Sequence, residues 1–162
     1  MKTALSRHLA QINIAKMKAP LDDPVMKGFL DLLERVNAAA DQSPGFVWRL
    51  QTEDGDATAL RVFDDPLVLV NMSVWKSVDS LRDYVYRSEH VIPFKNRRLW
   101  FDAAPDPHMA LWWIPAGHLP EVEEGRDRLH RLGRIGPTAQ AFTFARAYTP
   151  AGELIPRRGH DQ

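Results

Sequence analysis

The chain of 162 residues contains no cysteine, which excludes disulfide bonds, thiolate nucleophiles and zinc sites built on sulfur. It also has no surplus charge of either sign, because 21 Lys and Arg residues balance 21 Asp and Glu residues. Binding to nucleic acid or to an anionic membrane usually rests on excess basic charge, so we expect neither as a partner. The missing cysteine suits a reducing compartment, and we expect a cytoplasmic protein.

Long apolar runs are absent as well. The N-terminal segment lacks the unbroken apolar stretch of a signal peptide, and no run of about 18 apolar residues could span a bilayer. Hydrophobic residues make up 44% of the chain and charged residues 26%, which is the balance of one soluble domain with a core. We expect that domain in residues 1–147, followed by a loose polar tail in residues 148–162.

Residue periodicity predicts the order strand, helix, strand, strand, helix, strand, helix, strand. Turn-forming residues fill 52–58, and Pro93 is expected to break the second helix before a further helical piece at Phe94–Phe101. The remaining elements are strands at Leu9–Met17, Phe46–Leu50, Leu67–Trp75, His108–Ile114 and Ala141–Phe144, and helices at 24–40, from 77 onward and at 120–132.

This order predicts an α+β fold, a ferredoxin-like antiparallel sheet with helices on one face. In the strand Leu67–Trp75, one face is wholly apolar, whereas the other carries Asn71, Ser73 and Trp75. A sheet with helices on one face leaves its second face bare. A chain usually covers such a mixed surface with a partner subunit, so we expect a homodimer.

Four segments carry a family resemblance: NMSVWKSVDSLRDYVYRSEH (71–90), RRLWF (97–101), LWWIPAGHLP (111–120) and GPTAQAFTF (136–144). Over residues 8–146 the chain resembles a bacterial single-domain family of unknown function in the dimeric α/β-barrel superfamily, similar to the antibiotic-biosynthesis monooxygenases. The resemblance implies a pocket between sheet and helices in each subunit. The superfamily uses such pockets for cofactor-free oxidation of aromatic polyketides, for haem or for ligand sensing, so the fold does not define the function.

Haem is disfavoured as a cofactor by the same resemblance. The iron-binding histidine of the haem-degrading members lies further along the second helix than His90, near the positions of Phe94 and Lys95. Asn13, in contrast, stands on the first strand, where those enzymes also place an asparagine. We expect no resident cofactor, and haem is kept as the disfavoured alternative.

His90 lies within the first motif, near the end of a helix. Because its pKa is ordinarily close to neutrality, this histidine could act as a general base or donate a hydrogen bond to a ligand. Alternatively, it caps the last carbonyl groups of the helix.

Asn71, Ser73, Trp75 and Tyr84 are candidate ligand-binding residues from the same motif. A buried amide on a strand needs a hydrogen-bonding partner, which could be a ligand, a neighbouring loop or a second subunit. Trp75 could line a pocket for a flat molecule, although a tryptophan at the end of a strand is more often part of the core.

Trp112 and Trp113 point to opposite faces of their strand, so only one of them can reach the expected cavity. The alternation of His108, Ala110 and Trp112 favours Trp112 for the cavity and places Leu111 and Trp113 beneath the helices. A shift in strand register would reverse this assignment.

Arg97, Arg98 and Trp100 form a basic and aromatic cluster that could hold a carboxylate or phosphate group. The alternative is a solvated helix face, or ion pairs with the acidic stretch 121–124. No phosphate loop, nucleophile elbow or pair of metal-spaced histidines occurs in the sequence, and we predict no metal site.

The sequence therefore predicts a protein that binds a hydrophobic small molecule. In the enzymatic hypothesis it is a cofactor-independent monooxygenase or cyclase-like enzyme acting on an aromatic or polyketide-like substrate. There, His90 would be the base and Asn71 would stabilise the oxyanion, with Trp75 and Trp112 around the substrate. The alternatives are a non-catalytic ligand-binding or stress-related dimer and a haem-binding protein.

Overall fold

The computed structural model describes residues 6–51, 65–91, 94–103 and 107–156, and it leaves out the side chains of residues 88–96. The predicted turn segment at 52–58 lies outside the described residues. The elements are β1 (Arg7–Lys16), η1 (Pro24–Met26), α1 (Lys27–Asp41), β2 (Phe46–Arg49), β3 (Val68–Trp75), α2 (Val78–Val91), α3 (Phe94–Trp100), β4 (Met109–Pro115) and α4 (Val122–Ile135). Among the described helices, none has the length and apolarity to cross a membrane.

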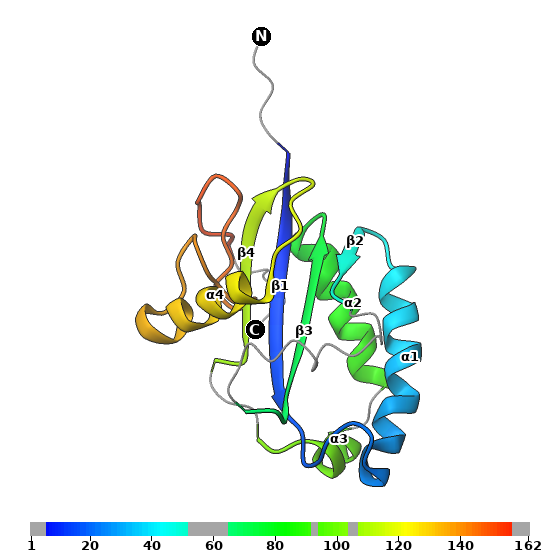
Figure 1. The fold of residues 1–162 in the computed structure, drawn as a ribbon. Helices are drawn as coiled ribbons and strands as arrows, with labels where there is room; N and C mark the ends of the chain where they lie inside the picture. The colour runs from blue at the N-terminus through cyan, green and yellow to red at the C-terminus, as the bar shows by residue number, and fades with distance from the viewer. Residues whose placement is uncertain (1–5, 52–64, 92–93, 104–106, 157–162) are drawn as a thin grey trace.

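The four strands form one antiparallel sheet in the order β2-β3-β1-β4 (Figure 1). β1 lies between β3 and β4, and a helix connects β1 to β2 and β3 to β4. This βαββαβ arrangement is the ferredoxin-like fold, so the predicted α+β class is confirmed.

Strand register divides the central sheet residues into two faces by parity. Ile12 is opposite both Met72 and Ala110, whereas Gln11 is opposite both Ser73 and Leu111. The even face is apolar and consists of Ala10, Ile12, Ile14, Val70, Met72, Val74, Ala110, Trp112 and Ile114. The odd face is mixed and consists of Leu9, Gln11, Asn13, Asn71, Ser73, Trp75, Leu111 and Trp113.

Helices cover both faces, which differs from the predicted arrangement with helices on one face only. α4 packs on the even face through Val122, Leu129 and Leu132. α1 and α2 contact each other and cover the odd face, with Ala40 and Leu81 in its core. In Figure 1, α4 lies over β4, and α1 and α2 run side by side near β3 and β2. The mixed face is therefore not bare, so the expected homodimer no longer follows from an uncovered face.

Two separate apolar clusters lie on the helix side of the odd face. The Trp75 cluster joins the start of α2 to β4 and comprises the buried residues Leu9, Ala40, Trp75, Val78, Leu81, Leu111, Phe142 and Ala147. The Met17 cluster lies where α3 and α1 close the opposite end and comprises Met17, Met26, Phe29 and Trp100. A backbone hydrogen bond joins the segment after β1 to the end of α3 there, since Lys18 N–H donates to the carbonyl of Trp100 over 2.8 Å.

The C-terminal segment 141–156 packs against β4. The predicted strand Ala141–Phe144 is reduced to one bridge, in which Leu111 and Phe142 exchange two backbone hydrogen bonds of 2.9 and 2.8 Å. The expected loose tail is ordered over its described part, since Tyr148 bridges Leu154 and its carbonyl accepts from the indole of Trp113. The apolar residues Tyr148 and Ile155 explain this difference, because both pack on the Trp75 cluster.

Gly125 permits the close approach of α4 to the even face, and this generates a stability prediction. A Cβ at Gly125 would lie 2.8 Å from Ile12 Cδ1 and 3.2 Å from Met72 Sδ. Alanine favours a helix by about 1 kcal/mol over glycine, but overpacking a core costs roughly 1–3 kcal/mol. We therefore expect Gly125→Ala to lower the free energy of unfolding by about 1 kcal/mol in urea titrations.

Ile12→Val provides the matched control, since it removes the Cδ1 atom that the new methyl group would meet. Alone, Ile12→Val should lower the free energy of unfolding by roughly 0.5–1.5 kcal/mol. Combined with Gly125→Ala, the total loss should be smaller than the sum of the two single losses. Strict additivity, or a stabilised Gly125→Ala variant, would show that α4 does not pack as closely as described.

Candidate functional site

A band of four polar side chains crosses the odd face between the Trp75 and Met17 clusters. Gln11 and Asn13 come from β1, and Asn71 and Ser73 come from β3. The register places Gln11 opposite Ser73 and Asn13 opposite Asn71. Alternation within two adjacent antiparallel strands therefore brings all four side chains together on one face.

Gln11 is the centre of this polar band and is only 2% exposed. Its Nε2 donates to Asn71 Oδ1 and to Ser73 Oγ, both over 2.8 Å, and its Oε1 accepts from Asn13 Nδ2 over 2.9 Å. Asn13 Nδ2 also donates to Asn71 Oδ1 over 3.2 Å. A buried amide left without partners costs about 1–3 kcal/mol, so these bonds fix the orientation of all three amides.

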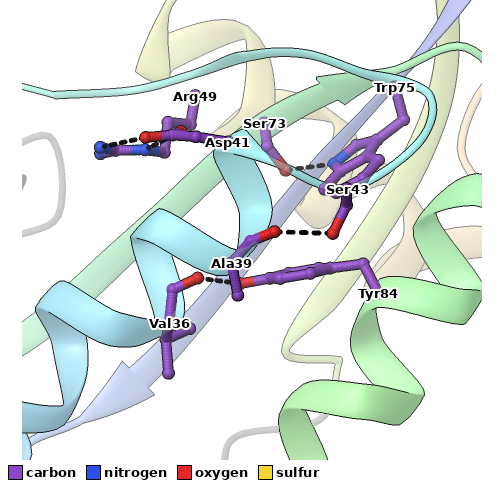
Figure 2. A network of polar contacts seen from close by, with 8 residues as sticks. All are labelled: Val36, Ala39, Asp41, Ser43, Arg49, Ser73, Trp75 and Tyr84. Carbon is purple, nitrogen blue, oxygen red and sulfur yellow. Dashed lines mark hydrogen bonds and ion pairs between the residues drawn. The ribbon is translucent and has the colours of Figure 1, made fainter.

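Trp75 and Tyr84 form an aromatic wall at one end of the polar band. The indole N–H of Trp75 donates to Ser73 Oγ over 2.8 Å, and Tyr84 stacks on the indole at a centroid distance of 5.0 Å (Figure 2). The hydroxyl of Tyr84 donates to the carbonyl of Val36 in α1 over 3.0 Å. Trp75 itself is fully buried, so Tyr84 is the aromatic residue of this pair that remains partly accessible.

Asn71 gives the polar band its free hydrogen-bonding capacity. Its Oδ1 accepts from both Gln11 and Asn13, which turns its Nδ2 away from them. Within the described part of the chain, the Nδ2 of Asn71 makes no hydrogen bond, and the residue is exposed although it lies on a helix-covered face. An amide nitrogen carries two N–H donors, and these donors can bind a ligand oxygen.

Trp112 does not belong to this site, which corrects the sequence-based assignment. It is opposite Ala10 on the even face, fully buried, and its indole N–H donates to Glu124 Oε2 in α4 over 2.9 Å. The other oxygen of Glu124 lies 2.8 Å from His118 Nε2. The sheet therefore separates Trp112 from Asn71. The prediction failed because the face of a residue depends on how its strand pairs with the neighbouring strand, and the sequence of one strand does not reveal that register. Trp113 lies on the odd face, where it packs against the Trp75 cluster.

The predicted basic and aromatic cluster does not form one site, because Trp100 is buried whereas Arg97 and Arg98 lie toward the surface. Trp100 is 6% exposed and packs on Phe29 at a centroid distance of 5.7 Å, so it belongs to the Met17 cluster. Arg97 is partly exposed and Arg98 exposed on α3. The acidic stretch 121–124 leads into α4 on the opposite face of the sheet.

His90 lies in α2, but its side chain is outside the described residues, as are those of Phe94 and Lys95. The predicted roles of His90, as a general base, a hydrogen-bond donor to a ligand or a cap of the helix, therefore stay predictions. In the described part of the chain, no group of three or more His, Asp or Glu side chains is placed to hold a metal ion.

Gln11 is the residue of the polar band that sequence reasoning missed. Its alternation with Ile12 already placed it on the same side of the first strand as Asn13. The missing information was the pairing with β3, which brings Gln11 opposite Ser73. A search for polar residues at matching parity on two strands predicted to be neighbours would have found it.

Solved structures of similar fold include two of SnoaB, a cofactor-independent oxygenase from Streptomyces nogalater. One of them, of a mutant, has 17% sequence identity and a TM-score of 0.43 and covers 70% of this chain and 98% of that chain. A protein from Nitrosomonas europaea assigned to the antibiotic biosynthesis monooxygenases has 13% identity and a TM-score of 0.44, covering 75% of this chain and all of that chain. No curated protein matches the chain in sequence.

The family match is much more extensive than these structural likenesses. Residues 8–157 match the family described as a domain of unknown function, DUF3291. This agrees with the resemblance inferred from the four sequence motifs. The chain belongs to the DUF3291 family.

Proposed function

We propose that the chain binds a flat, hydrophobic small molecule that presents an oxygen atom to Asn71. The observation that carries this proposal is the exposed Asn71 amide, whose N–H donors are unused within the described residues. The polar band holds this amide in place through a buried glutamine. Binding by preorganised donors avoids the cost of ordering them when the ligand arrives.

The surroundings of Asn71 support a flat ligand rather than a strongly charged one. Tyr84 lies over Trp75, four residues along β3 from Asn71, which corresponds to roughly 13 Å of extended strand. At the other end of the polar band, Leu69 lies two residues before Asn71 on the same face of β3 and packs against the Met17 cluster. A molecule with two or three fused rings matches this alternation of aromatic, polar and apolar surface.

Asn71 also supports the enzymatic form of this proposal, a cofactor-independent monooxygenase. An N–H donor aimed at a phenol or enol oxygen stabilises its anion more than its neutral form. That electron-rich anion can react with dioxygen, converting a ring CH2 to a carbonyl while the second oxygen atom leaves as water. His90 would accept the proton in this scheme.

Non-catalytic binding is the second candidate, because it requires the same polar band and no base.

The homodimer expected from the family resemblance stays part of either proposal. Its stoichiometry can be measured directly by sedimentation velocity, and a monomer at micromolar concentration would remove it.

Removing the donor of Asn71 should weaken ligand binding. For 2-naphthol as the probe, we expect Asn71→Ala to lose roughly three- to tenfold in affinity, as one hydrogen bond to a neutral oxygen contributes about 0.5–1.5 kcal/mol. Isothermal titration calorimetry measures the change. Gln140→Ala is the matched control, since it removes an exposed amide beside α4 and should leave the affinity unchanged. Equal affinities of Asn71→Ala and the unmodified chain would contradict the proposal.

Turnover can be tested separately with anthrone, whose central CH2 becomes the second carbonyl of anthraquinone. We expect the chain to accelerate this conversion with one O2 consumed per molecule. Asn71→Ala and His90→Ala should each slow it by about a hundredfold or more, the lower end of the effect of losing an oxyanion donor or a general base. Absorbance and an oxygen electrode follow the reaction. Binding of 2-naphthol without any acceleration would leave only the non-catalytic candidate.

A further inference from the structure

A cavity lies outside the polar band, beside β4. It has a volume of about 510 Å³ and opens to solvent between the first turns of α2, the odd face of β4 and the C-terminal segment. Its principal walls are Asp79 and Arg82 of α2, Trp113 of β4, and Phe144 and Ile155 of the C-terminal segment. This volume is within the usual range for small-molecule sites, roughly 300–1,000 Å³.

Arg82 supplies the cationic group of this cavity and is weakly held. Its Nη2 lies 3.4 Å from the carbonyl oxygen of Phe144, and its Nη1 lies 3.6 Å from Asp79 Oδ1. Both distances exceed those of strong charge-assisted hydrogen bonds, about 2.7–2.9 Å. The guanidinium has five N–H donors in a fixed plane, so much of its capacity remains for an anion.

Aromatic side chains position Arg82 and form the apolar part of the cavity. The guanidinium carbon lies 5.4 Å from the ring centroid of Phe144, within the range of a cation–π contact. The indole N–H of Trp113 is already used, because it donates to the carbonyl of Tyr148 over 2.7 Å. Trp113 therefore offers apolar surface rather than a hydrogen bond. Arg82 is 37% exposed at its side chain, so a ligand can reach it from solvent.

We propose that this cavity binds a small aromatic carboxylate, with the carboxylate on Arg82 and the ring against Trp113 and Phe144. A planar guanidinium matches a carboxylate with two parallel hydrogen bonds. Asp79 opposes the anion electrostatically and competes for the same guanidinium. The site is thus one for a weakly acidic, flat molecule, and it is independent of the polar band around Asn71.

The test uses 2-naphthoate and its neutral analogue 2-naphthamide, titrated into the purified chain by calorimetry. The unmodified chain should bind the carboxylate about tenfold more tightly than the amide, and Arg82→Gln should abolish this preference. Asp79→Asn should increase the affinity for 2-naphthoate, because it removes the competing charge. Arg146→Gln is the matched control, since Arg146 is an exposed arginine of the same C-terminal segment that does not line the cavity.

Equal affinity for the two probes would overturn the proposal, as would an equal loss of naphthoate binding in Arg82→Gln and Arg146→Gln. Circular dichroism and the thermal midpoint verify that each variant is folded. Arg82→Lys supplies a second readout should Arg82→Gln be unstable, because it keeps the charge but lacks the planar fork and should show a reduced preference. In the Asn71→Ala background, Arg82→Gln should still abolish the preference for 2-naphthoate over 2-naphthamide, so failure of this proposal is distinguishable from failure of the proposed function.

Discussion

The buried amide of Gln11 is the constraint on which the polar half of this structure depends. At 2% exposure it must satisfy its donors and its acceptor within the protein, and it does so through Asn13, Asn71 and Ser73. These bonds require β1 and β3 to be paired in one register, since a slip of one residue would move the partners to the other face. The same bonds leave the donors of Asn71 directed away from the network. The requirement to satisfy Gln11 thus orients the amide that we propose as a binding group.

The two faces of the sheet consequently have different roles. The even face is sealed by α4, which lies so close that Gly125 has no room for a side chain above Ile12. A hydrogen bond from Trp112 to Glu124 joins the sheet to this helix. The odd face lies under α1 and α2 and keeps a polar band between two apolar clusters. The accessible amide donors of the polar band, those of Asn71, therefore lie on the odd face.

Local patterns predicted the elements well and the assembly only in part. Alternation and proline positions correctly placed β1, β3, β4 and the end of α2, because these signals act over a few residues. The face of Trp112 was wrong, because it depends on the register of β4 against β1 and on the position of α4, which are long-range properties. Trp100 likewise looked like a ligand-binding residue from its basic neighbours, whereas packing on Phe29 makes it part of the core.

The central claim is that the Asn71 amide is a preorganised donor for a ligand oxygen. Two-dimensional ¹⁵N–¹H NMR of the side-chain amides, recorded during titration with 2-naphthol, tests it most directly. The Nδ2 resonances of Asn71 should move most. Those of the side-chain amides of Asn13 and Gln11 should move less, because both donate to Asn71 Oδ1, and those of Gln140 should stay in place. Stationary Asn71 resonances at a ligand concentration that saturates binding would contradict it.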